Sequence, residues 1–164
     1  MPQIVRRLDR HDAREFQEIE LESLRHYPAA FSASYDDERV VPREAVGRRL
    51  EQATVFGGFA EGDLGAIATY HRGVLRKRAH VGMVSGMYVR DRYRGRGLAR
   101  AVLTRVISHA AQEVDQLELF VAIGNDRARH FYDRFGFRPY GRMQRALRVG
   151  DVDYDADMLV LTFR

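Results

Sequence analysis

The chain of 164 residues contains no cysteine. This absence excludes disulfide bonds, a thiolate zinc site and a covalent acyl-cysteine intermediate. Long apolar runs are also missing. No segment approaches the roughly 20 residues that cross a bilayer, and the first ten residues, MPQIVRRLDR, lack the apolar stretch of a signal peptide. We therefore expect a cytoplasmic protein with no membrane partner.

Several familiar motifs are absent as well. No GxxxxGK[ST] occurs, and Arg100 stands where a dinucleotide-binding fingerprint needs a third glycine or an alanine. Neither Ser85 nor Ser108 lies in a G-x-S-x-G elbow. These absences argue against a P-loop, a Rossmann site and a serine nucleophile. With 45% hydrophobic residues and no repeat or low-complexity linker, residues 1–164 fit a single domain.

The most informative segment that is present runs from Met87 to Ala110. Before the glycine turn of this segment, apolar residues alternate from Val81 to Val89, which predicts a strand. The sequence Arg94-Gly95-Arg96-Gly97 follows, and then an apolar face recurs at steps of three and four, which predicts a helix. Glycines before a helix leave main-chain N–H groups open to an anion. The segment therefore favours a phosphate-binding turn.

A second segment begins with a predicted strand from Leu117 to Ile123. Asn125 then opens a short helix that ends at Gly136. Taken alone, Asn125 fits an ordinary helix cap, and Tyr132 fits a core aromatic residue whose hydroxyl reaches water.

Together the two segments resemble the GNAT (GCN5-related) N-acetyltransferases. The motif [Q/R]-x-x-G-x-[G/A] matches Arg94, Gly97 and Ala99, a register that places the turn directly against the helix. It can also be laid on Arg92, Gly95 and Gly97. The second motif, N-x-x-A-x-x-x-Y-x-x-x-G-F, is complete. Its fixed positions are Asn125, Ala128, Tyr132, Gly136 and Phe137.

The resemblance implies acetyl-CoA as cosubstrate, no metal, and transfer to a primary amine of a small molecule or peptide. It places Asn125 in the second cofactor segment and implies that Tyr132 protonates the departing thiolate. The pantetheine arm would lie along Met87, Tyr88 and Val89. The pyrophosphate would lie on Arg94, Gly95, Arg96, Gly97, Leu98 and Ala99.

The general base stays open, because no carboxylate occurs between His80 and Val89, where the family often carries a glutamate. The acceptor also stays open among peptide N-termini, lysine side chains, polyamines, amino-acid analogues and aminoglycosides. Candidates for the base are Glu20, Glu22, Asp36 to Glu38, His80, Asp155 and Asp157.

Two other function classes remain. One is a non-catalytic acyl-CoA binder with the same fold. The other is a nucleic-acid module, since the net charge is +4 and RDRYRGRGLAR resembles an arginine-glycine tract. No helix-turn-helix, zinc finger or RRM signature accompanies that tract, so we expect no nucleic-acid partner. Exposed closing strands make a homodimer plausible.

The order of elements predicts a mixed α/β (α+β) fold rather than a doubly wound one. The resemblance implies a central, mostly antiparallel sheet of about six or seven strands with about four helices. Hairpin strands are expected from Val55 to Ala60 and from Leu64 to Tyr70, with a basic loop from His71 to His80. Two closing strands are expected near 137–140 and 154–163.

Overall fold

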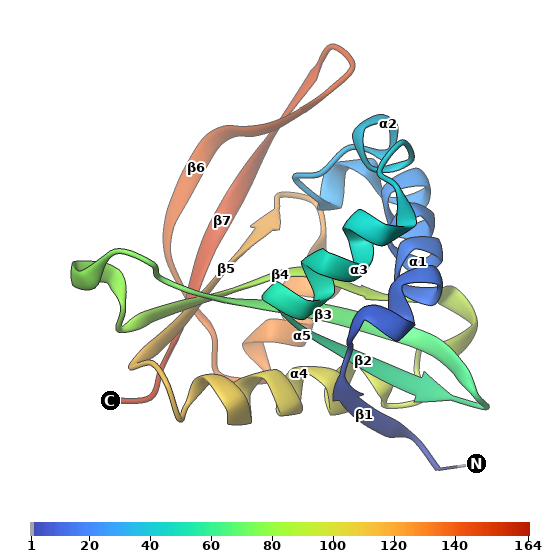
Figure 1. Cartoon of the computed structure of the whole chain (residues 1–164). Helices are drawn as coiled ribbons and strands as arrows, with labels where there is room; N and C mark the ends of the chain where they lie inside the picture. The colour runs from blue at the N-terminus through green and yellow to red at the C-terminus, as the bar shows by residue number, and fades with distance from the viewer. Residues whose placement is uncertain (1) are drawn as a thin grey trace.

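The computed structural model describes residues 2–164 and contains one seven-stranded sheet flanked by helices (Figure 1). The strand order is β1-β2-β3-β4-β5-β7-β6, and all neighbours are antiparallel except β4 and β5. The expected mixed, mostly antiparallel fold is confirmed. Five α-helices are described, and the one beyond the expected four, α2, is a single turn. The strands are β1 Ile4–Arg7, β2 Thr54–Ala60, β3 Asp63–Arg72, β4 Val81–Val89, β5 Gln116–Ala122, β6 Arg138–Val149 and β7 Val152–Thr162. The helices are α1 Ala13–His26, α2 Tyr35–Glu38, α3 Arg43–Gln52, α4 Leu98–Ala110 and α5 Asp126–Asp133.

Helices cover both faces of the sheet, and each face has its own apolar core. Helix α4 lies along one face, whereas α1 and α3 lie on the other (Figure 1). On α4 the predicted apolar face is confirmed, since Leu98, Val102 and Val106 are fully buried. Phe16 and Ile19 of α1 are buried in the core of the opposite face. Burying each such side chain stabilises the fold by about 1.5–3 kcal/mol.

Strand β4 carries a bulge that sequence alternation did not predict. Ile67 faces Tyr88 and Thr69 faces Ser85, so β4 has one residue more than β3 over this stretch. Gly86 has φ of 59°, the left-handed value that such a bulge needs. The expected alternation over the whole of Val81 to Val89 is therefore wrong, because the extra residue exchanges the two faces of the strand partway along it.

The first closing strand is much longer than expected. The strand expected near 137–140 is β6, which extends to Val149, whereas the strand expected near 154–163 is β7, Val152–Thr162, close to its expected bounds. Together β6 and β7 form a hairpin that turns at Gly150. Most of β6 is exposed, and the exposed strand therefore lacks the apolar run that marks a buried strand in a sequence. The basic connection from β3 to β4 is shorter than expected, since β3 reaches Arg72 and a 3-10 turn follows at Arg76–Arg78. Among residues 2–164 no helix has the length and apolar character needed to span a membrane.

Candidate functional site

The turn before α4 presents main-chain donors to an open space. Gly95 and Gly97 have φ of 74° and 83°, and no atom lies within 4 Å of a Cβ built on either. Helix α4 begins at Leu98, and its first main-chain hydrogen bond runs from Ala101 N–H to the Gly97 carbonyl at 3.0 Å. Within residues 2–164 nothing accepts a hydrogen bond from the N–H groups of residues 95–100. These donors fit a diphosphate.

A cavity of about 560 Å³ opens in front of this turn and continues to α5. It brings together all the predicted cofactor residues except Arg96. The guanidinium of Arg96 is held outside by an ion pair with Glu61 at 2.9 Å, and its carbonyl accepts a hydrogen bond from Gln3. The predicted residues that line the cavity are Met87, Tyr88, Val89, Arg94, Gly95, Gly97, Leu98, Ala99, Asn125 and Tyr132.

The guanidinium of Arg94 fixes one wall of this cavity. Its Nε donates to the Val89 carbonyl at 3.2 Å, and its Nη1 donates to the Tyr27 hydroxyl at 3.0 Å. The same group pairs with Asp91 at 3.0 Å and lies over the Tyr27 ring. Arg94 therefore ties the end of β4 to the segment that follows α1.

The other arginines near the turn fall into two groups. Arg100, Arg127 and Arg134 line the cavity and form no ion pair within the described chain. Sequence reasoning missed Arg127 and Arg134, because they lie on and just after α5, far along the chain from the glycine turn. The remaining arginines of the tract are ion-paired: Arg90 with Glu22 at 3.1 Å, Arg92 with Asp63 at 2.7 Å and Arg96 with Glu61 at 2.9 Å.

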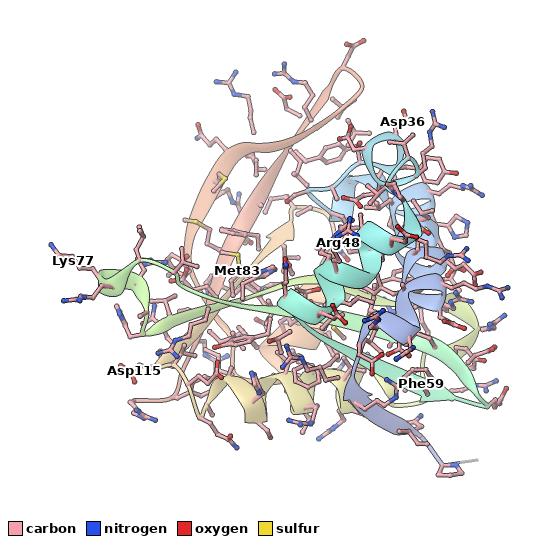
Figure 2. All side chains as sticks on the ribbon, in the orientation of Figure 1. Asp36, Arg48, Phe59, Lys77, Met83 and Asp115 are labelled. Carbon is pink, nitrogen blue, oxygen red and sulfur yellow. The ribbon has the colours of Figure 1, made fainter. Side chains whose placement is uncertain are left out.

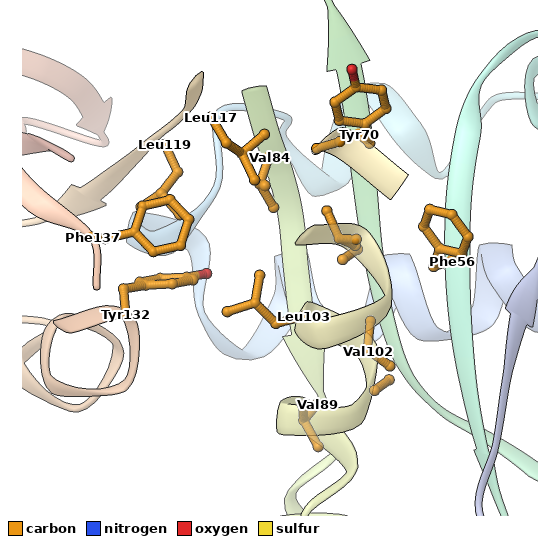
Figure 3. Close-up of a cluster of buried hydrophobic side chains, with 14 of the residues drawn as sticks. Phe56, Tyr70, Val84, Val89, Val102, Leu103, Leu117, Leu119, Tyr132 and Phe137 are labelled. Atoms are coloured by element: carbon orange, nitrogen blue, oxygen red, sulfur yellow. The ribbon is translucent and has the colours of Figure 1, made fainter. Parts of the chain in front are cut away.

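Asn125 and Tyr132 lie at the α5 side of the cavity. The Asn125 side chain accepts from Ala128 N–H at 3.3 Å, so the expected helix cap is confirmed. Tyr132 is 7% exposed, and its ring meets Phe137 edge to face, with Leu103 of α4 nearby (Figure 3). Burial raises the pKa of Tyr132 above its ordinary value of 10.0. The hydroxyl therefore keeps its proton at neutral pH.

Strands β4 and β5 separate beside this cavity. They are paired only between Val81–Met83 and Gln116–Glu118, although β4 continues to Val89 and β5 to Ala122. Beyond Met83 the edge of β4 that faces β5 has no strand partner in the described chain. Such an edge offers main-chain hydrogen bonds to an extended ligand.

A second cavity, of about 640 Å³, lies on the other face of the sheet at this separation. It shares Ala30 and Phe31 with the first cavity, so the two adjoin. Met83 lies between β4 and the β6–β7 hairpin in Figure 2 and lines this second cavity. Most of its walls are apolar, and they include Phe31, Leu50, Ile67, Phe120, Met143 and Leu147.

The charged side chains of the second cavity come from α1, α2, α3 and β3. Arg49 pairs with Glu38 at 3.0 Å and lies 3.8 Å from Glu20. Burial, and next the nearby charge of Glu38, raise the pKa of Glu20 to about 7, against the opposing effect of Arg49. The His71 ring lies 2.7 Å from the Ser85 hydroxyl, and burial lowers its pKa.

The structure narrows the open list of bases. Glu20 and Glu38 line the second cavity, whereas Glu22, His80, Asp155 and Asp157 line neither cavity. Asp157 is paired with two arginines, and Asp155 accepts a main-chain hydrogen bond from Arg145. Among residues 2–164 no three His, Asp or Glu side chains gather as a metal site would require.

The chain therefore has, in the separation of β4 from β5 and the glycine turn at the start of α4, a site whose geometry fits coenzyme A. It belongs to the GNAT family of acetyltransferases. The family model described as "Acetyltransferase (GNAT) family" matches residues 13–137, which include both motifs. Acetyltransferases of this family use acetyl-CoA. No curated protein sequence matches the chain.

Solved structures agree on the fold at low sequence identity. A GNAT-family acetyltransferase from Streptococcus pneumoniae superposes with a TM-score of 0.88 at 20% identity, covering 99% of this chain and 100% of that one. The putative acetyltransferase yncA from Salmonella typhimurium, determined with acetyl-CoA, superposes with a TM-score of 0.87 at 18% identity, covering 100% of this chain and 95% of that one. A ribosomal-protein-alanine N-acetyltransferase from Brucella melitensis superposes with a TM-score of 0.84 at 19% identity, covering 97% of this chain and 99% of that one.

Proposed function

We propose that the chain is an acetyl-CoA-dependent N-acetyltransferase that acetylates a primary amine held in the second cavity. The observation that carries this proposal is the meeting of the two cavities at Ala30 and Phe31. One cavity has the main-chain donors of the glycine turn, and the other has the carboxylate of Glu20. A donor and an acceptor amine bound in them would meet where β4 and β5 separate.

The first cavity would hold the cosubstrate through main-chain N–H groups and positively charged side chains. The N–H groups of residues 95–100 would bind the diphosphate, with Arg100, Arg127 and Arg134 supplying positive charge. The free edge of β4 near Met87 would hold the extended arm. Bound there, acetyl-CoA supplies an activated acetyl thioester.

Glu20 takes a proton from the acceptor ammonium, since an amine attacks only when it is neutral. A lysine-like amine has a pKa of about 10.4, and an ordinary glutamate about 4.3. With the pKa of Glu20 raised to about 7, the difference between amine and base falls from about 6 to about 3. Glu20 is thus a far better proton acceptor than a solvated glutamate, and about half of it is ionised at neutral pH.

Tyr132, which lines the first cavity, holds a proton at its hydroxyl oxygen. Its pKa lies above the value of about 8.5 that is ordinary for a thiol. Complete transfer of that proton to a thiolate therefore runs uphill, and donation of a hydrogen bond to the departing sulfur is the role that the burial of Tyr132 favours.

The ion pairs of Arg90, Arg92, Arg94 and Arg96 argue against the nucleic-acid alternative. Four of the five guanidinium groups of this tract already lie against a carboxylate, and the fifth, Arg100, lines the first cavity, so the tract does not form a free basic surface.

Thermal shift with acetyl-CoA, followed by an assay of free thiol over a panel of amines, tests the proposal. We expect both a shift and amine-dependent thiol release. A shift without thiol release from any amine would support the non-catalytic binder. Nucleic-acid binding that coenzyme A does not displace would support the third class.

A further inference from the structure

The charges of the second cavity limit which amines can occupy it. Its cations within the described chain are Arg49 and His71. Arg49 is already engaged by Glu38 at 3.0 Å and Glu20 at 3.8 Å. His71 is hydrogen-bonded to Ser85, and its lowered pKa keeps it neutral. No unengaged cation therefore faces an incoming carboxylate or phosphate.

The charged side chains of the second cavity carry one unmatched negative charge when Glu20 is ionised. Glu20 and Glu38 carry two negative charges, and Arg49 carries one positive charge. One ammonium group would neutralise this cluster, but a second ammonium would have to remain unpaired in an apolar enclosure, which is costly. Polyamines and aminoglycosides, which bring several cations, match the cavity poorly.

The apolar walls of the second cavity favour an apolar body on the ligand. Phe31 lies in the segment after α1, Leu50 on α3 and Ile67 on β3. Phe120, Met143 and Leu147 come from β5 and the β6–β7 hairpin. Phe120 and Met143 are each 43% exposed, unusual for large apolar side chains facing a cavity, and an apolar ligand would cover them. A peptide would instead bring backbone amides against walls with few hydrogen-bonding partners.

We infer that the acceptor is a small primary monoamine with an apolar body and no carboxylate, its ammonium held by Glu20 and Glu38 and its body by the apolar walls. This inference rests on the proposed function and specifies its substrate class. A volume of about 640 Å³ admits an aromatic or medium-chain aliphatic amine. Glu38 and Arg49 then determine substrate specificity, because the ion pair with Glu38 prevents Arg49 from binding a substrate carboxylate.

Matched pairs of probes test the inference. Phenethylamine and phenylalanine differ by a carboxylate, and hexylamine and 1,6-diaminohexane differ by a second ammonium. We expect kcat/KM to be at least about tenfold higher for the first member of each pair. Calorimetry without acetyl-CoA should show the same order of binding. A phenylalanine-initiated peptide amide is the third probe and should be at least about tenfold poorer than phenethylamine.

The variant Glu38→Gln supplies a readout that simple loss of folding would not give. It removes the negative partner of Arg49 and frees this guanidinium for a carboxylate, so the preference for phenethylamine over phenylalanine should fall by at least about tenfold. The matched control is Asp36→Asn on the same helix. Asp36 points into solvent, 85% exposed and paired with Arg39, and its loss should leave the preference unchanged (Figure 2).

Equal or better turnover of phenylalanine, the diamine or the peptide would overturn the substrate class while leaving the acetyltransferase in place. Acetyl-CoA binding without turnover of either apolar amine would overturn it as well. An absence of acetyl-CoA binding to the folded protein would instead overturn the proposed function itself.

Discussion

Replacing Glu20 by glutamine should make the protein less active and, at alkaline pH, more stable. The pKa of Glu20 is raised to about 7 in the folded chain from an ordinary 4.5, first by burial and then by Glu38. The folded state therefore binds this proton more tightly than the unfolded state does. Stability then falls as the pH rises from about 4.5 to about 7, because the unfolded chain ionises first. Glutamine carries no charge and removes this penalty.

The size of the effect follows from that difference in pKa. A difference of about 2.5 corresponds to about 3 kcal/mol once Glu20 is fully ionised in both states. The Glu20 side chain is 18% exposed, so solvent screening reduces this figure only in part. We expect Glu20→Gln to gain less than about 1 kcal/mol over the wild type at about pH 5 and about 3 kcal/mol at about pH 8.5.

Urea unfolding of both proteins at the two pH values measures the gain directly. Glu18→Gln is the matched control, since Glu18 lies on the same helix, is 54% exposed and pairs with Arg14. Its stability relative to the wild type should not change with pH by more than a few tenths of a kcal/mol. If Glu20→Gln and Glu18→Gln respond alike to pH, the carboxyl of Glu20 is not desolvated and the reasoning about its pKa fails.

The same substitution should lower kcat/KM by about 10²–10⁴-fold and remove the rise in rate toward pH 7. The wild-type rate should increase with pH up to about 7, because only the ionised form of Glu20 accepts a proton. An unchanged pH profile in the variant would assign the proton transfer to another group, and Glu38 and His71 are the other candidates in the cavity.

Three further changes test separate parts of the structure. Tyr132→Phe should keep acetyl-CoA affinity but lower kcat by about 100-fold, and an unaltered kcat in steady-state assays would remove Tyr132 from the reaction. Gly97→Ala should cost about 1–2 kcal/mol through its φ of 83° and also weaken coenzyme A binding. Gly62→Ala is the control, since Gly62 has φ of 84° in the β2–β3 turn. It should cost the same stability but leave the affinity for coenzyme A, measured by calorimetry, unchanged. Equal affinities of the two variants for coenzyme A would contradict the role of the turn before α4. Asp12→Asn should cost about 1.5–3 kcal/mol at neutral pH, because Arg6 donates two hydrogen bonds to this carboxylate. Arg6 lowers the pKa of Asp12, so this contribution begins to fall below the ordinary aspartate pKa of about 3.9. A difference between the two proteins that does not shrink as the pH falls below that value would contradict this origin.

Local signals predicted the parts of the fold that depend on neighbouring residues. Gly97 precedes α4 in the register that the motif favoured, and Asn125 caps α5 through its own side chain. The apolar periodicity of Leu98 and Val102 correctly gave the buried face of α4. In each case the determining interaction lies within one turn of the chain, so the sequence contains it directly.

The bulge at Gly86 and the length of β6 were not predictable in this way. A bulge depends on the register between β3 and β4, which is a property of two strands and not of one. Strand β6 is held by its pairing with β7 while most of its side chains face solvent, so no apolar pattern marks it. Long-range pairing decided both features.

The proposed base, Glu20, could not be predicted from the sequence for a related reason. Where the family often places a carboxylate on β4, this strand has Ser85 and Gly86 at the bulge, and both line the second cavity. A carboxylate can reach the same cavity from α1, because α1 packs against β3 and β4 on that face of the sheet. Glu20 has the same residue type as its solvated neighbour Glu18, and only its burial near Glu38 separates the two. In this chain the proposed proton acceptor is therefore placed by the packing of α1 against the sheet where β4 and β5 separate, which is a long-range feature that the sequence around Glu20 does not contain.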